Sequence, residues 1–226
     1  MVQTGDLEDL RRRGGRRAGF LTGSVLGART VPIHATWTGT DRGSGLARYE
    51  LRLRAGTGAW TLTDDGLPTG RATTQVAPGR AYTFRGTVVD RAGNPATSTG
   101  PSLDLRQIDD RAASVAWSSG WRSLSSSSAA GGTVRASSKA GATATVRFTG
   151  RAFAWVAPTG PTRGSARVYV DGVYKATVSL WRSAPTSRVI VWASAWAASG
   201  THTVTIRIIG TSGHPRVDID AFLTLR

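Results

Sequence analysis

Five side chains, all in the second half of the chain, have the chemistry needed to hold a sugar. An indole ring stacks against the C–H face of a pyranose, and a guanidinium group binds a carboxylate or a pair of hydroxyls. Trp181 and Trp196 fall at the ends of strand-like runs, and Arg163 lies in a loop rich in Pro and Gly. Any single tryptophan is found more often in a core than on a surface. We predict a ligand-binding set of Trp121, Arg163, Asp171, Trp181 and Trp196.

Residue combinations typical of catalysis are not visible in the sequence. The fourteen acidic residues include only two glutamates, Glu8 and Glu50, and the three histidines lie far apart, at His34, His202 and His214. No G-x-S-x-G motif occurs, and the lack of cysteine excludes thiolate metal sites, disulfides and a cysteine nucleophile. Because none of the usual acid–base or nucleophile pairings is present, we expect no catalytic residues and a protein that is not an enzyme.

The net positive charge of the chain predicts that it attracts polyanions in general and does not select one kind of polyanion. The 226 residues carry a formal net charge of +15, almost all of it from arginine, since Lys139 and Lys175 are the only lysines. Basic residues are spread over both halves of the chain, so we expect no specific nucleic-acid partner. The sequence has no run of about 18 apolar residues, and we therefore expect no membrane span.

The elements that must position these side chains are strands. Apolar and polar residues alternate with a period of two, and turn-forming Gly, Pro, Asn and Asp recur between the runs. No stretch has a convincing helical period. The pattern predicts an all-β fold class built from β-sandwiches. The clearest runs are 31–37, 49–53, 142–148, 204–208 and 217–223.

Turn signals and composition divide the chain into three parts. Residues 1–20 contain the basic run "RRRGGRR", and we expect a basic, disordered tail there. The stretch "GPSLDLRQIDD" marks a junction, which gives a first β-sandwich at 21–106 and a second at 107–226. The serine-rich "SLSSSSAAGG" is too short to link domains, so we expect it to be an exposed loop of the second sandwich.

Three ordered motifs of the first part carry a family resemblance. "DRGSGLARYELRL", "VAPGRAY" and "VVDRAGN" resemble a fibronectin type III or bacterial immunoglobulin-like module over about residues 24–105. In such modules a corner tyrosine precedes a central strand, and Tyr82 stands at that position. The resemblance implies a spacer or presentation module, with Trp37, Trp60 and Tyr82 in its core.

The second part resembles a different family. Its "VYVDG" hairpin and terminal "VDIDAF" are similar to galactose-binding-like jelly rolls, which occur as non-catalytic modules of secreted bacterial glycosidases and cell-surface proteins. The resemblance implies glycan binding outside the cell or at its surface. It argues for a fold better than for a ligand. No apolar signal-peptide segment follows the arginines near Met1.

We expect no cofactor, and the one alternative that the same resemblance implies is a structural calcium ion. Related jelly rolls hold calcium between an acid on the last strand and acids near the start of the domain, and calcium takes six to eight oxygen ligands. Asp218 and Asp220 are two apart on a strand and would share a face. In the alternative, backbone amides or an arginine cap one aspartate and the other is solvated. The predicted ligands are Asp109, Asp110, Asp218 and Asp220.

Two loops of the second part have predictable shapes. "APTGPTRG" is longer than a hairpin connection needs, and its prolines favour a rigid, shaped loop that packs on the end of the sandwich. In the alternative, the loop also forms one wall of a binding site. The Asp171-Gly172 turn keeps one face of its hairpin apolar if Val168 pairs with Ala176. We therefore expect a three-residue turn, Asp171-Gly172-Val173, with a bulge.

Together these features predict an all-β, non-catalytic protein of two sandwiches, an immunoglobulin- or fibronectin-like one followed by a galactose-binding-like jelly roll. The second would bind a glycan or an anionic cell-wall polymer at the cell surface or outside the cell, and the first would act as a spacer. Two alternatives remain open. The chain could be a structural or adhesive spacer from a larger exported protein, or it could bind polyanions, nucleic acid included, through dispersed arginine charge.

Overall fold

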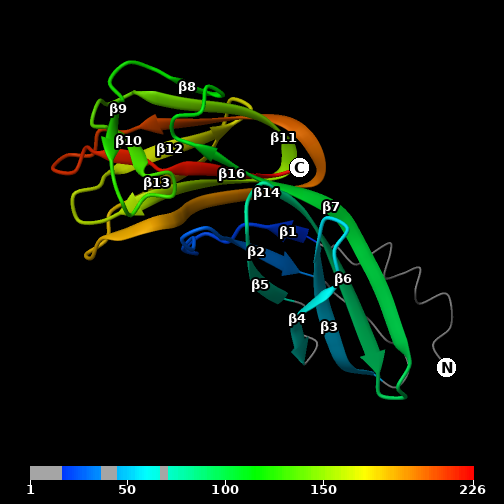
Figure 1. The fold of residues 1–226 in the computed structure, drawn as a ribbon. Helices are drawn as coiled ribbons and strands as arrows, with labels where there is room; N and C mark the ends of the chain where they lie inside the picture. Colours follow the sequence, from blue (N-terminus) through cyan, green and yellow to red (C-terminus); the bar gives the residue numbers. More distant parts are fainter. Residues whose placement is uncertain (1–16, 37–44, 67–70) are drawn as a thin grey trace.

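The computed structural model describes residues 17–36, 45–66 and 71–226, and Figure 1 shows their arrangement. These residues form strands, turns and loops, and none of them lies in a helix. The all-β prediction is therefore confirmed. Residues 1–16 of the expected tail, and Trp37 with the turn that follows it, lie outside the described residues.

The first sandwich consists of two antiparallel sheets, whose strands alternate buried and half-buried residues as the period-two pattern predicts. One sheet has the order β1-β2-β5, and the other contributes β4-β3-β6-β7. The strands are β1 (Arg17–Gly19), β2 (Val31–Thr36), β3 (Leu46–Ala55), β4 (Thr61–Gly66), β5 (Arg71–Val76), β6 (Arg80–Asp90) and β7 (Pro95–Asp109).

The second sandwich is built around two long strands that bend. The pairing of β11 with β14 runs to Gly150 opposite Gly200, and it resumes at Ala152 opposite Ala195. A side chain at Gly150 would collide with the carbonyl group of Leu225, so the bend requires glycine. The strands are β8 (Val115–Trp117), β9 (Arg122–Ser125), β10 (Thr133–Ser137), β11 (Thr143–Thr159), β12 (Ser165–Val170), β13 (Val173–Ser179), β14 (Thr186–Ile208), β15 (Val217–Ile219) and β16 (Ala221–Leu225).

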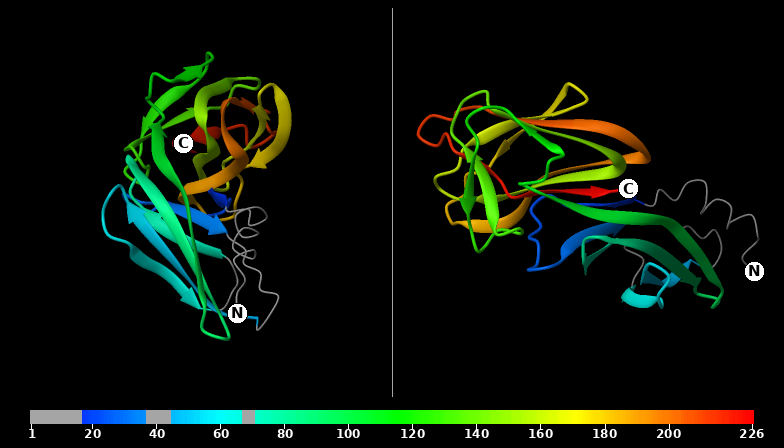
Figure 2. Two further views of the ribbon diagram at one scale, coloured as in Figure 1. Left: turned by 90° about the vertical axis from the view of Figure 1, so that its right-hand side faces the viewer. Right: turned by 45° about the horizontal axis from the view of Figure 1, so that its top comes forward.

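One continuous sheet joins the two sandwiches. Strand β7 pairs with β6 along most of its length and with β16 through its last five residues, Leu105–Asp109. The resulting order is β13-β12-β14-β11-β16-β7-β6-β3-β4, and Figures 1 and 2 show β7 running from one sandwich to the other. The boundary expected after residue 106 falls inside this strand. Backbone bonds between 23–26 and 188–190 add a second connection.

The core forms two clusters whose boundary lies within β11 and β16. The small residues Ala152, Ala154 and Val156 face the cluster of the first sandwich, together with Leu223 and Leu225. Their chain neighbours Phe153, Trp155 and Phe222 face the cluster of the second. Because successive strand residues point to opposite faces, these two strands supply both cores at once.

The turn between β12 and β13 differs in part from the prediction. Val168 pairs with Ala176, as expected, but Val170 pairs with Val173, so the turn has two residues rather than three. Asp171 (φ 51°) and Gly172 (φ 79°) both adopt the left-handed conformation of a type I′ turn. The extra residue lies within the strands, where the register shifts after Val168. The expected bulge is therefore present, but it lies outside the turn.

Two further observations bear on the sequence predictions. Tyr82 is buried, and its hydroxyl donates a 2.8 Å hydrogen bond to the carbonyl of Ala77, as a corner tyrosine does. The part of the chain that the structure describes contains no helix long and apolar enough to cross a membrane.

Candidate functional site

A rigid five-residue loop, 160–164, connects β11 to β12. Its backbone is tied at both ends, because Gly160 N–H donates to Leu180 (3.0 Å) and Gly164 N–H donates to Arg216 (2.7 Å). A side chain at Gly164 would collide with the carbonyl group of His214, so only glycine allows this approach. The loop is shorter than the sequence indicated because β11 continues to Thr159.

The loop places Arg163 against a buried carboxylate. Asp218 is fully buried, with Arg163 Nε 2.5 Å from its Oδ2 and Arg216 Nη2 2.6 Å from its Oδ1. The Arg216 contact is also a well-aligned hydrogen bond, whereas the Nε–H of Arg163 is not directed at the oxygen. Two guanidinium groups thus share one carboxylate, which fixes both side chains and leaves a local charge of +1.

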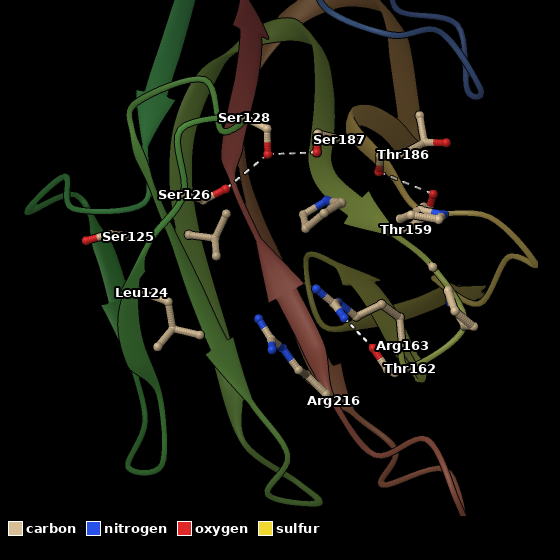
Figure 3. Close-up of a pocket in the computed structure, with 15 residues that line it drawn as sticks. Leu124, Ser125, Ser126, Ser128, Thr159, Thr162, Arg163, Thr186, Ser187 and Arg216 are labelled. Carbon is tan, nitrogen blue, oxygen red and sulfur yellow. Dashed lines mark hydrogen bonds between the residues drawn. The ribbon is translucent and has the colours of Figure 1, made fainter.

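On one side of Arg163 lies a cavity of about 650 Å³ that we call the serine hollow. Ser128 is hydrogen-bonded to Ser126 (3.1 Å) and to Ser187 (3.0 Å), which forms a row of hydroxyls. Figure 3 shows both guanidinium groups, those of Arg163 and Arg216, pointing into this hollow. The remaining wall comes from the loop itself and from the segment at Pro185–Ser187.

On the other side lies a shallower cavity of about 400 Å³, the tryptophan hollow. Trp181, 47% exposed, forms one wall, and Arg163, Thr211 and His214 complete it together with Ser179. In such a cavity an exposed indole can stack on a sugar ring, while the guanidinium and hydroxyl groups donate hydrogen bonds to the oxygens of the sugar. Arg163 lines both hollows.

The structure brings Arg163 and Trp181 together but places the other three predicted residues elsewhere. Asp171 lies at the opposite end of the β12–β13 hairpin, where its carboxylate is 2.8 Å from His202 Nδ1. The pKa of Asp171 is lowered, chiefly by this hydrogen bond. Trp196 stacks on the His202 ring at 4.0 Å between ring centroids. Trp121 is half-buried, and its Nε1 donates to the Thr143 carbonyl.

The four aspartates predicted to bind calcium separate into two groups. Asp218 forms ion pairs with Arg163 and Arg216. Asp109, Asp110 and Asp220 instead interact electrostatically with one another. Burial raises the pKa of Asp220 to about 6, although its carboxylate accepts the Ala130 N–H. Burial also raises the pKa of Asp110. Burial acts in the same direction on Asp109, but hydrogen bonds from Arg111 outweigh it and lower that pKa.

This acidic cluster does not have the geometry of a metal cage. Asp110 Oδ1 accepts a 2.7 Å bond from Thr133, while its Oδ2 is buried without a hydrogen-bond donor. That orphaned oxygen invites a proton or a cation. However, within residues 17–36, 45–66 and 71–226 no three acidic or histidine side chains converge closely enough to hold a metal ion. The residues as placed do not fit a calcium site, and calcium binding stays a prediction.

Several lining residues were missed from the sequence. Arg216 stands two positions before Asp218, and residues i and i+2 of a strand share a face, so "RVD" was a recognisable sign of an ion pair. Ser128, Thr211 and His214 gave no such sign, because they come from loops that only the tertiary fold brings together with Ser187 at the start of β14.

Comparison with known proteins finds a sequence relative over part of the chain. No family model matches the chain. A 115-residue stretch, 51% of the chain, is 36% identical to an A type blood N-acetyl-alpha-D-galactosamine deacetylase of Flavonifractor plautii. The match spans only 14% of that protein's length. The expectation of a protein that is not an enzyme is thereby corrected, because the relative is named as an enzyme.

Two solved structures resemble the chain remotely. A Paenibacillus xanthan lyase has a TM-score of 0.41 at 9% identity, over 88% of this chain and 19% of the lyase. An exo-beta-1,3-galactanase of Phanerochaete chrysosporium has a TM-score of 0.34 at 12% identity, over 92% of this chain and 56% of the galactanase. Likenesses this weak carry no argument about function. The resemblance of residues 21–106 to fibronectin or immunoglobulin-like modules is not confirmed by any comparison.

Proposed function

We propose that this chain is a glycan-binding region of a carbohydrate-active enzyme and that it holds a sugar in the tryptophan hollow. The observation that carries the proposal is that Arg163, which buried Asp218 holds in place, lines one cavity together with the exposed ring of Trp181. Stacking on Trp181 supplies affinity, and the guanidinium orients the ligand. The sequence relative, a deacetylase of an N-acetylgalactosamine epitope, makes N-acetylgalactosamine the first ligand to try.

The first test is calorimetric titration of the chain with N-acetylgalactosamine, galactosamine, galactose and glucose. Trp181→Ala is expected to weaken binding at least about tenfold, the loss typical of removing a central aromatic contact. Arg163→Lys keeps the charge beside Asp218 but loses the planar fork, so a smaller loss is expected. An assay for released acetate on the same samples shows whether turnover accompanies binding.

The matched control is Tyr174→Ala. Tyr174 is a 52% exposed aromatic residue at the opposite end of β13 from Trp181, so its loss should leave affinity unchanged. The proposal fails if none of the sugars binds, or if Tyr174→Ala weakens binding as much as Trp181→Ala does.

Residues 21–106 would serve as a fibronectin type III-like support for this site. The two sheets with orders β1-β2-β5 and β4-β3-β6-β7 support that assignment, as does the Tyr82–Ala77 hydrogen bond. In this proposal the enzyme acts outside the cell or at its surface, where polymeric glycans are found.

A further inference from the structure

Two arginines of the first sandwich stack on a single tryptophan. The guanidinium carbon of Arg54 lies 4.7 Å from the centroid of the Trp60 ring, and that of Arg85 lies 4.4 Å from it. Arg54 is on β3 and Arg85 on the neighbouring strand β6, both on the face that turns away from the core. We call Arg54, Trp60 and Arg85 the arginine clamp.

Neither arginine of the clamp has a charged partner among the residues that the structure describes. Among the described residues no carboxylate forms an ion pair with Arg54 or Arg85, and the Nε atom of each is buried without a hydrogen-bond partner. Buried polar groups usually have a hydrogen-bond partner, so two neighbouring N–H donors without an acceptor call for a functional explanation. Stacking engages the flat face of a guanidinium and leaves its N–H edges free to donate.

The surrounding face is positive. Arg52 lies directly opposite Arg85 across the β3–β6 ladder. Glu50 on β3 is already bound by Arg48 (3.3 Å) and Arg52 (3.1 Å). Asp65 lies opposite Glu50 on β4, so these two acids share the face with four arginines, Arg48, Arg52, Arg54 and Arg85. Like charges held close together repel, and an anion placed between them would remove that cost.

We infer that the arginine clamp is a binding site for the carboxylate or sulfate group of an acidic polysaccharide. The outer Nη groups of Arg54 and Arg85 would hold the anion, and rotation of either flexible side chain would add its Nε–H. Planar bidentate donors of this kind match oxyanions of either type.

Single-stranded nucleic acid is the less suitable occupant. It is held by aromatic rings on which bases stack. Trp60 is already engaged by two guanidinium groups, and the other aromatic residues of β3 and β6, namely Tyr49, Tyr82 and Phe84, are buried in the core. The clamp thus offers charge and hydrogen-bond donors but no free ring.

This inference is independent of the proposed function. The tryptophan hollow belongs to the second sandwich and shares no residue with the clamp. Failure of either test therefore leaves the other standing.

The experiment measures binding of the full chain to polygalacturonate, to chondroitin sulfate, to neutral galactan and to single-stranded DNA at several salt concentrations. Arg54→Gln and Arg85→Gln are each expected to weaken binding to one or both acidic glycans at least about tenfold, as removal of a hydrogen-bonded charge does. Comparison of the uronate and the sulfated polymer identifies which anion the clamp prefers.

The control is Arg48→Gln, which removes the same charge from the same face. Arg48 is 62% exposed and committed to Glu50, so its loss should change affinity less than about twofold if the clamp is a defined site. Equal losses for Arg48→Gln and Arg85→Gln would show diffuse charge attraction and overturn the inference. So would DNA binding as tight as that of the acidic glycans with the same sensitivity to Arg85→Gln.

A second variant guards against misfolding. Arg85→Lys retains the charge but loses the fork, and it should reduce affinity for the acidic polymer while the melting temperature stays close to that of wild type. Unchanged affinity in both Arg85→Lys and Arg54→Lys would show that the stacked guanidinium groups only stabilise the fold, and would equally overturn the inference.

Discussion

Asp218 and Asp220 stand two positions apart and are both buried, yet they have different partners. Asp218 lies between the guanidinium groups of Arg163 and Arg216. Asp220 receives one backbone N–H, from Ala130, and burial raises its pKa to about 6. The first carboxylate therefore anchors Arg163, the arginine that we propose orients a sugar. The second makes the stability of the protein depend on pH.

We predict that stability falls as the pH rises from about 4 to about 7 when chelator is present. The pKa of Asp220 is higher in the folded than in the unfolded chain, so its stabilising contribution is complete below the unfolded value near 4 and is lost as the pH passes 6. A shift of about two units corresponds to at most about 3 kcal/mol. Urea unfolding across this range should show the decline, and Asp220→Asn should flatten it.

The control for this prediction is Asp104→Asn, which alters a surface carboxyl paired with Arg106. Equal flattening by both variants would contradict the assignment to Asp220. Calcium added near pH 7 tests the cofactor prediction: a rise in melting temperature for wild type that is absent from Asp220→Asn would support it.

At the scale of elements, the β12–β13 hairpin shows how two turn residues fix a register. Asp171 accepts the N–H of Thr203 at 2.7 Å, which ties the turn to the adjacent strand β14. Gly172 has a φ of 79°, and a side chain there would have no atom within 4 Å. Any cost of replacing Gly172 therefore comes from the backbone alone.

We predict that Gly172→Ala lowers the free energy of unfolding by about 1 kcal/mol, the cost of the left-handed conformation for a residue with a Cβ. Sugar binding should be unchanged, because the tryptophan hollow lies at the other end of the hairpin. Gly100→Ala on β7 is the matched control, since φ there is outside the left-handed region and its Cβ would meet only an ordinary contact at 3.6 Å. Equal losses for the two variants would disprove the conformational explanation.

The sequence predicted these elements well where the signal was local. The alternation of apolar and polar residues identified the strands. The requirement that one face of the hairpin stay apolar identified the Val168–Ala176 pair, but it cannot distinguish a longer turn from a bulge within a strand. Trp181 was predicted to be exposed from its polar neighbours. Trp121 and Trp196 carried the same signal, but the ring of Trp117 packs edge-on against Trp121 and the ring of His202 stacks on Trp196, contacts that periodicity does not report.

At the scale of the whole molecule, the dominant feature is the sheet shared through β7. Its continuity with β16 was not predictable, because the period-two pattern of β7 is the same whether a strand has one neighbour or two. The alternation of Ala152, Ala154 and Val156 with Phe153 and Trp155 was a usable sign of two different cores. It does not reveal which other segment covers the small side chains.

We predict a single unfolding transition for both sandwiches. Leu223→Ala, at a fully buried position of β16 facing the first sandwich, should lower the free energy of unfolding by about 3 kcal/mol. Tryptophan fluorescence reports mainly on the second sandwich, and hydrogen exchange of β2 reports on the first. In Leu223→Ala the unfolding transitions reported by the two probes should shift together. In Leu124→Ala, at a partly exposed position, neither transition should shift. Two separated transitions would contradict the prediction.

The strand common to both sandwiches also removes any hinge between the tryptophan hollow and the arginine clamp. Two sites on a flexible tether meet a polymer at an effective concentration set by the length of the tether. Here β7 and its ladder to β16 hold them at one separation. Under the two proposals, a polysaccharide that reaches from one site to the other gains avidity without the entropic cost of ordering a linker, and a polysaccharide too short to reach gains none.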